Sequence, residues 1–188
     1  YNIVNNGMCI GDCMKFTHED KLCIPVPFFH CFGLVLAIMA SITHATAMVP
    51  VEYYRPTAVM KAVQEEECTA VHGVPTMFIA MLEHPDFHKY RFPKLRTGIM
   101  AGSPCPIKVM QQVVEKMHMS EITITYGQTE ASPATTMTTT DDSIELRVTT
   151  VGRHMPHVET KIVDPETGEV YLSTTQEDPI PMELLTAA

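Results

Sequence analysis

The fold of this chain is decided by residues 95–130, LRTGIMAGSPCPIKVMQQVVEKMHMSEITITYGQTE. Residues 95–100 predict a strand that runs into the stiff turn at 102–104. Residues 106–117 predict a helix, because Pro106 suits its first turn. Residues 121–126 alternate apolar and polar side chains, which is typical of a strand. Two strands joined by a helix predict a parallel pair in an α/β sheet.

Strand-like and helix-like segments continue to alternate toward the N-terminus. In order along the chain they are 22–26, 31–43, 45–49, 57–67, 68–72 and 76–83. Thr57, directly after Pro56, is the expected N-cap of the helix at 57–67. We therefore expect an α/β fold: a layered, mostly parallel β-sheet with flanking helices.

Three further segments carry weaker local signals. Asn5, Asn6 and Gly7 predict a turn near the N-terminus. The Thr-rich residues 132–150 show no clear period and are expected to be irregular. Residues 157–163 and 169–172 flank a Pro- and Gly-containing turn, so they predict a β-hairpin.

The charge is unevenly placed along the 188 residues. Residues 1–120 carry 10 acidic and 10 basic side chains, whereas residues 121–188 carry 12 acidic and 3 basic ones, giving the formal net charge of -9. A nucleic-acid-binding surface normally needs a basic patch, so the sequence argues against a nucleic-acid partner. A polyanionic ligand would have to be held by backbone N–H groups and a metal ion.

The cysteines and the uncharged middle of the chain bear on the compartment. Six cysteines without a CxxC pair are typical of reduced thiols in an intracellular protein, and a disulfide framework is the alternative. Residues 22–51 lack charged side chains, which raises the question of a transmembrane segment. Pro25, Pro27 and Pro50 break the stretch, so we expect a buried strand–helix–strand unit and no membrane span.

Three constellations carry candidate chemistry, and each has a plainer alternative. Residues 126–130, Tyr-Gly-Gln-Thr-Glu, offer an aromatic ring for a base, a hydroxyl for phosphate and a carboxylate for Mg²⁺; the alternative is a strand followed by a polar turn. Residues 100–106 form a turn that can hold a planar group, or merely connect a strand to a helix. His30 lies among aromatics, where it gates an apolar pocket or is a buried core histidine.

Taken together in order, five motifs resemble the adenylate-forming (AMP-binding) acyl-CoA synthetases. Within that superfamily the resemblance is greatest to the mitochondrial medium-chain type, and it covers residues 1–170 as part of the large adenylation domain. The motifs are PFFHCFG at 27–33, GVPTM at 73–77, RTGIMAGSPCP at 96–106, YGQTE at 126–130 and VGRHMP at 151–156.

The resemblance implies a two-step reaction. A fatty carboxylate attacks the α-phosphorus of MgATP to give acyl-AMP and pyrophosphate, and the thiol of coenzyme A then displaces AMP. ATP, Mg²⁺ and coenzyme A are thereby implied, together with a mitochondrial matrix location.

The same resemblance assigns roles to residues by matching positions. Tyr126 lies against the adenine, with Gly102, Ser103 and Pro104 as the opposite wall, and Gly127 and Gln128 form the turn over the acyl-phosphate. Thr129 and Glu130 are catalytic, the first contacting phosphate and the second holding the metal. The acyl channel is bordered by His30, Val74, Thr76 and Gly98.

Departures from the family pattern set a further expectation. The family's phosphate loop, ribose-binding Asp and catalytic Lys have no counterpart, and residues 171–188 do not match. We therefore expect a fragment of a medium-chain fatty-acid CoA ligase that is inactive alone and that self-associates through open surfaces. The alternatives are a non-catalytic nucleotide-, acyl- or partner-binding fragment, and another adenylating enzyme such as an aryl-acid ligase.

Overall fold

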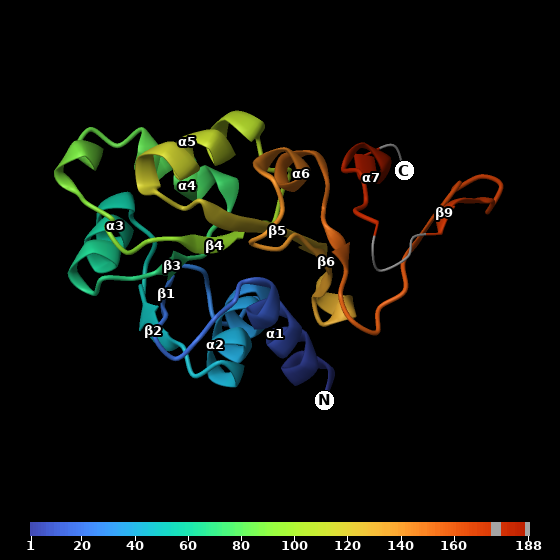
Figure 1. Cartoon of the computed structure of the whole chain (residues 1–188), viewed down its shortest axis with the longest axis horizontal. Helices are drawn as coiled ribbons and strands as arrows, with labels where there is room; N and C mark the ends of the chain where they lie inside the picture. Colours follow the sequence, from blue (N-terminus) through green and yellow to red (C-terminus); the bar gives the residue numbers. More distant parts are fainter. Residues whose placement is uncertain (174–177, 187–188) are drawn as a thin grey trace.

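A computed structural model of the chain describes residues 1–173 and 178–186. Its centre is a seven-stranded sheet with the order β2-β1-β3-β4-β5-β6-β7 (Figure 1). Strands β1 to β5 pair in parallel, whereas β6 and β7 add to one edge in antiparallel fashion. The expected mostly parallel α/β sheet is confirmed. The strands are β1 (Lys21–Ile24), β2 (Ala47–Pro50), β3 (Ala70–Val71), β4 (Thr97–Met100), β5 (Glu121–Gly127), β6 (Ala134–Met137) and β7 (Arg153–His154).

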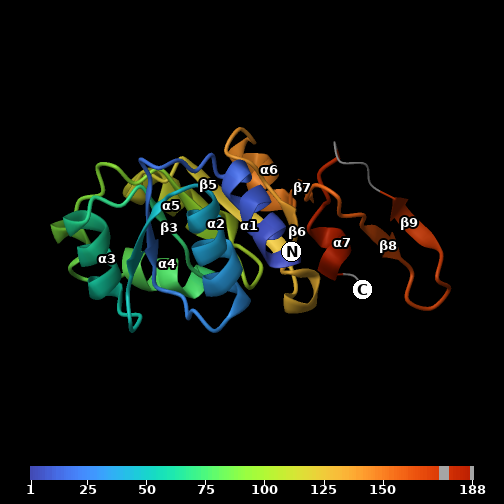
Figure 2. The same cartoon turned by 90° about the horizontal axis from the view of Figure 1, so that it is seen from below.

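Helices cover both faces of the sheet, so the sheet forms the middle of three layers (Figures 1 and 2). One face carries α1 (Asn2–Cys13), the π-helix η1 (Phe32–Met39) and α2 (Ala40–Thr43), whose buried side chains share one core cluster. The other face carries α3 (Pro56–Glu65), α4 (Pro75–Leu82), α5 (Ile107–Met117) and α6 (Ile144–Thr149), which share a second cluster.

Period-two alternation along the strands supplies both cores. Leu22 and Ile24 of β1 belong to the cluster under α1, whereas Cys23 between them belongs to the cluster under α3. Ile99 and Met100 of β4 divide in the same way. A strand buried on both faces needs apolar side chains at successive positions, which explains the part of the uncharged stretch that forms β1. The expected second buried strand is wrong, because β2 is the edge strand of the sheet and is mostly exposed.

The helix at 57–67 is confirmed, but its expected N-cap is wrong. The N-cap is Arg55, and the helix α3 begins at Pro56, whose fixed φ and missing N–H suit the first helical position. Thr57 is therefore already inside the helix.

The predicted turn at residues 5–7 is wrong, because these residues lie within α1. A Cβ on Gly7 would lie 2.5 Å from the Cβ of Met39, so glycine here lets α1 approach η1 closely. Asn6 is buried and bonds to the backbone of Ala134. Tertiary packing overrides the local turn preference of these residues.

The expectation of irregular structure at 132–150 is also wrong. This region contains β6 and α6, and the hydroxyl of Ser143 caps α6 by accepting the Leu146 N–H at 3.2 Å. Arg147 of α6 is buried, and its guanidinium donates to the carbonyl oxygens of Ser120 and Ile122 at 2.7 and 3.0 Å. These long-range bonds give the region its structure and leave no periodic trace in the sequence.

The C-terminal part contains the predicted hairpin and a return to the main body. Strands β8 (Lys161–Val163) and β9 (Val170–Ser173) pair in antiparallel fashion, which confirms the hairpin. Of the non-matching tail expected at 171–188, residues 174–177 and 187–188 lie outside the described residues. Ile180 exchanges backbone hydrogen bonds with Val151 and Gly152, just before the short helix α7 (Glu183–Thr186). Among the described residues, no helix is both long and apolar enough to cross a membrane.

Candidate functional site

A cavity of about 300 Å³ lies where the neighbouring parallel strands β4 and β5 end. It brings together five predicted residues, namely Gly102, Ser103, Pro104, Tyr126 and Gly127. The ring of Tyr126 remains accessible, since the residue is 46% exposed. Ligands of open α/β sheets bind at the carboxyl ends of the strands, which is where this cavity opens. Its other lining residues are Cys105, Ile124, Thr125, Val151 and Met182.

The wall at 102–104 depends on backbone geometry and on one thiol. Gly102 has a φ of +91°, a conformation that L side chains rarely adopt. The thiol of Cys105 donates to the carbonyl oxygen of Met100 at 3.2 Å and so closes the turn. Burial raises the pKa of Cys105 to about 12, which keeps the thiol protonated and able to donate at neutral pH.

The opposite wall is a strand end that folds back on itself. A Cβ on Gly127 would overlap the carbonyl oxygen of Pro133, so the close approach requires glycine. The N–H of Gln128 donates to the same carbonyl at 3.0 Å. The short helix η3 (Thr129–Ala131) follows, and its first two residues are exposed beside the cavity-lining strand end. Gln128, Thr129 and Glu130, which are predicted site residues, follow the cavity-lining Gly127 in sequence but line neither this cavity nor the smaller one described next.

A smaller cavity of about 90 Å³ adjoins the first one and contains His30. The two cavities share Gly102, Thr125 and Gly127. The Nδ1 atom of His30 accepts the N–H of Phe32 at 3.1 Å, so its imidazole presents Nε2 away from the helix. The apolar part of the lining consists of Phe32, Leu36, Ala101, Pro133 and Ala134.

The other expected acyl-channel residues do not line either cavity. Val74 is half-buried, and its Cγ1 would lie 3.1 Å from a Cβ on Gly102, beside the turn at 102–104. Thr76 is exposed in the first turn of α4. Gly98 is buried inside β4, where a Cβ would overlap the carbonyl oxygen of Val71. Of the four predicted channel residues, His30 alone lines one of these two cavities.

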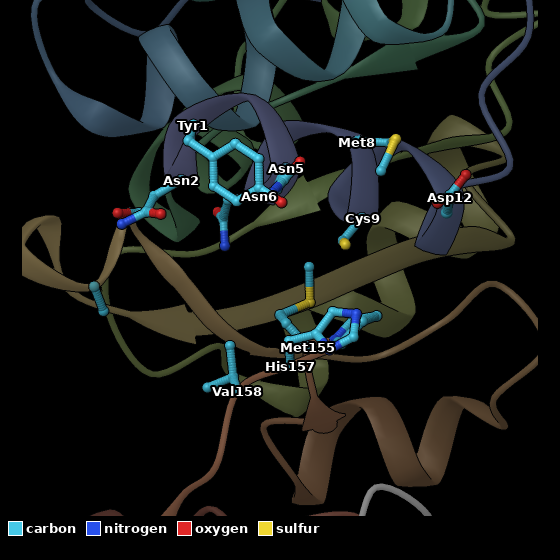
Figure 3. A pocket seen from close by; sticks show the side chains of 13 residues that line it. Tyr1, Asn2, Asn5, Asn6, Met8, Cys9, Asp12, Met155, His157 and Val158 are labelled. Carbon is cyan, nitrogen blue, oxygen red and sulfur yellow. The ribbon is translucent and has the colours of Figure 1, made fainter.

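A larger cavity of about 810 Å³ lies between α1 and residues 155–158 (Figure 3). It contains none of the predicted site residues, although Ala131 and Ser132, which follow Glu130, form part of its wall. Asn2, Asn5 and Asp12 line its α1 side. Cys9 and His157 also line it, so this cavity has polar side chains of its own.

Charge is placed away from the two cavities at the strand ends. Neither has Lys or Arg among its described lining residues. Arg96 instead pairs with Asp20 and Glu121 at the opposite, amino-terminal ends of β1, β4 and β5. Burial alone would raise the pKa of Asp20, but hydrogen bonds from Arg96 and Thr69 lower it below the ordinary value. This network ties the amino-terminal ends of these strands together, away from the two cavities.

Two residues that support the site, Asn6 and Met182, were not predicted from the sequence. The amide of Asn6 donates to the carbonyl oxygen of Ala134 at 2.7 Å and accepts its N–H at 3.1 Å. These two hydrogen bonds join α1 to β6, the strand next to Gly127. Met182, from the C-terminal segment, lines the cavity between residues 102–105 and 124–127. Neither contact has a local signal, because the partners are far apart in the sequence.

Fold and site together define an α/β protein with a ligand cavity where neighbouring parallel strands end. The AMP-binding enzyme family matches residues 1–175, well over half of the sequence. The chain belongs to this AMP-binding enzyme family.

Two curated relatives indicate the kind of enzyme. The putative acyl-CoA synthetase YngI of Bacillus subtilis is 56% identical over 167 residues, which are 89% of this chain and 30% of the relative. The mitochondrial medium-chain acyl-CoA ligase ACSF2 of Mus musculus is 40% identical over 175 residues, 90% of this chain and 28% of the relative. The chain thus spans less than a third of either relative. The expectation of greatest similarity to the mitochondrial type is not supported, because the bacterial protein is more similar.

A solved structure shows the same fold. The N-terminal domain of FACL13 from Mycobacterium tuberculosis superposes with a TM-score of 0.76 at 20% identity, covering 90% of this chain and 42% of that one. At this level of identity the likeness concerns the fold alone.

Proposed function

We propose that this chain supplies the base- and phosphate-binding part of an AMP-forming acyl-CoA synthetase. Such an enzyme activates a carboxylic acid with ATP to acyl-AMP and then transfers the acyl group to coenzyme A. The observation that carries the proposal is the cavity between residues 102–105 and 124–127, which contains an accessible Tyr126. Membership of the AMP-binding family and relatives named as acyl-CoA synthetases support it.

The geometry of the two cavities supports the following proposed roles. Tyr126 stacks on adenine, and Gly102, Ser103 and Pro104 face it across the base cavity. Gly127 and Gln128 turn the chain so that the acyl-phosphate can pass close to the backbone. His30 borders the smaller cavity, where the acid would enter beside the α-phosphate. Positioning the carboxylate for in-line attack is then the main catalytic contribution of these residues.

The residues at η3 fit a metal that arrives with the substrate. Glu130 is a single exposed carboxylate beside the hydroxyl of Thr129, and no cluster of three His, Cys, Asp or Glu is present in the described part of the chain. Mg²⁺ usually keeps several waters and binds one or two carboxylates plus substrate phosphates. We therefore propose that Glu130 holds Mg²⁺ bound to ATP, where the ion would neutralise phosphate charge.

For the acid we propose a medium-chain fatty acid. Phe32, Leu36 and Ala101 give the smaller cavity an apolar wall, which suits a hydrocarbon chain. The printed name of the mouse relative describes a medium-chain ligase. A mitochondrial location is not supported, because the bacterial relative is more similar to this chain than the mitochondrial one.

The test is calorimetric titration of the chain with octanoyl-sulfamoyl-adenosine, a non-hydrolysable acyl-AMP analogue. Stacking on an aromatic side chain contributes about 1–3 kcal/mol per base, so Tyr126→Ala should weaken binding by roughly tenfold or more. Tyr53→Ala is the matched control, because Tyr53 is exposed and lies outside both cavities.

Two results would contradict the proposal: no binding of the analogue, or an equal loss in both variants. Acetyl and palmitoyl analogues test the acid, and a preference for either over octanoyl would overturn the medium-chain assignment.

A further inference from the structure

One contact joins the two sides of the proposed site. The hydroxyl of Thr129 donates to the Sγ atom of Cys31 at 3.4 Å, across 98 positions of sequence. Cys31 stands at the N-cap of η1 and lines the smaller cavity beside His30. Thr129 is the first residue of η3. The thiol is therefore placed against the hydroxyl that the proposed function assigns to phosphate.

The chemistry of the pair allows it to persist while phosphate is bound. A thiol is a weak donor and a weak acceptor, and a hydroxyl has one proton and two lone pairs. In the free protein the hydroxyl proton of Thr129 points to sulfur. When that proton turns to a phosphate oxygen, a lone pair of the hydroxyl oxygen faces sulfur, and the S–H of Cys31 can donate to it. The contact reverses direction without moving either side chain.

We propose that Cys31 is a positioning residue, which holds the hydroxyl of Thr129 in the orientation needed for the substrate phosphate. This inference rests on the proposed function. Cys31 itself does not touch the reacting atoms. Its contact joins the N-terminus of η1 to η3. The orientation of the Thr129 hydroxyl is therefore fixed by a second element as well as by the exposed turn.

The test compares ligands with and without phosphate, using the full 188-residue chain. Losing one neutral hydrogen bond changes an equilibrium by roughly fivefold, so Cys31→Val should weaken MgATP binding about fivefold. Adenosine affinity should stay within twofold, because the base cavity does not include Cys31. Cys31→Ser retains a donor and an acceptor, and it should restore MgATP binding.

A double-mutant cycle isolates the pair. In a Thr129→Val background, Cys31→Val should have no further effect beyond twofold. An equal effect in both backgrounds, a parallel loss of adenosine binding, or failure of Cys31→Ser to restore binding would overturn the inference.

A ligand-free measurement separates failure of this inference from failure of the proposed function. Iodoacetamide alkylation of the folded chain is followed at the peptide that contains Cys31, by mass spectrometry. Thr129→Val should change this rate at least threefold, while the rate at Cys9 on α1 stays the same. An unchanged rate at Cys31 would overturn the positioning role even if nucleotide binds. Absence of nucleotide binding with a changed rate would contradict only the proposed function.

Discussion

Acidification should destabilise this protein through one buried side chain, His72. Its residue is 0% exposed, and the imidazole lies between the rings of Phe16 and Phe32. Nδ1 accepts the N–H of Ile99 at 3.1 Å, and Nε2 donates to the carbonyl oxygen of Leu36 at 3.0 Å. The bond accepted at Nδ1 requires the neutral imidazole, because both nitrogens of a protonated ring are donors. Burial lowers the pKa of His72 to about 4.

The sign and size of the effect follow from proton linkage. In the unfolded chain His72 is protonated below about pH 6.5, whereas in the folded chain it is protonated only below about pH 4. The free energy of unfolding therefore falls as the pH falls through this window. A difference of about 2.5 pKa units corresponds to a loss of roughly 3 kcal/mol from this residue.

Urea unfolding followed by far-UV circular dichroism at pH 7, 6, 5 and 4 measures the effect. His72→Gln replaces the imidazole with a side chain that does not titrate, so the difference between wild type and variant isolates His72 from the carboxylates. The wild type should lose about 3 kcal/mol more than His72→Gln between pH 7 and 4. The matched control is His88→Gln, which makes the same replacement at an exposed position. Parallel curves for wild type and His72→Gln would refute the reasoning.

Three further substitutions test the supports of the site. Asn6→Leu removes the two hydrogen bonds from the Asn6 side chain to the buried N–H and C=O of Ala134. Urea unfolding should therefore show that the free energy of unfolding falls by about 2–4 kcal/mol, and a fall below about 1 kcal/mol would contradict this. Arg147→Met removes a buried guanidinium that donates to four backbone carbonyls. Thermal unfolding should show that the free energy of unfolding falls by about 3 kcal/mol or more, and an unchanged melting temperature is the opposing result. Gly127→Ala places a Cβ against the Pro133 carbonyl, so acyl-AMP analogue affinity should fall at least tenfold with unchanged circular dichroism, and retained affinity would count against the close approach.

Periodicity predicted the strands and helices that bury apolar side chains at regular intervals. The sequence 95–130 contains the complete unit of β4, α5 and β5, and the structure confirms it within two residues at each boundary. Local signals failed at Asn6 and Gly7, whose turn preference is weaker than the packing of α1 against η1 and β6. They also failed at α6, where Arg147 bonds to carbonyl oxygens of distant residues.

The residue pattern along the chain predicted the class of fold, the two turns that wall the cavity at the strand ends, and the order of the motifs. These features are local, because they depend on strand period, on Gly102 and Gly127, and on residues within a few positions of each other. Only the tertiary structure decided that Cys31 meets Thr129, that Asn6 supports Ala134, and that Met182 completes the cavity. Such contacts depend on which elements become neighbours in the sheet, and the spacing of residues along the chain does not encode them.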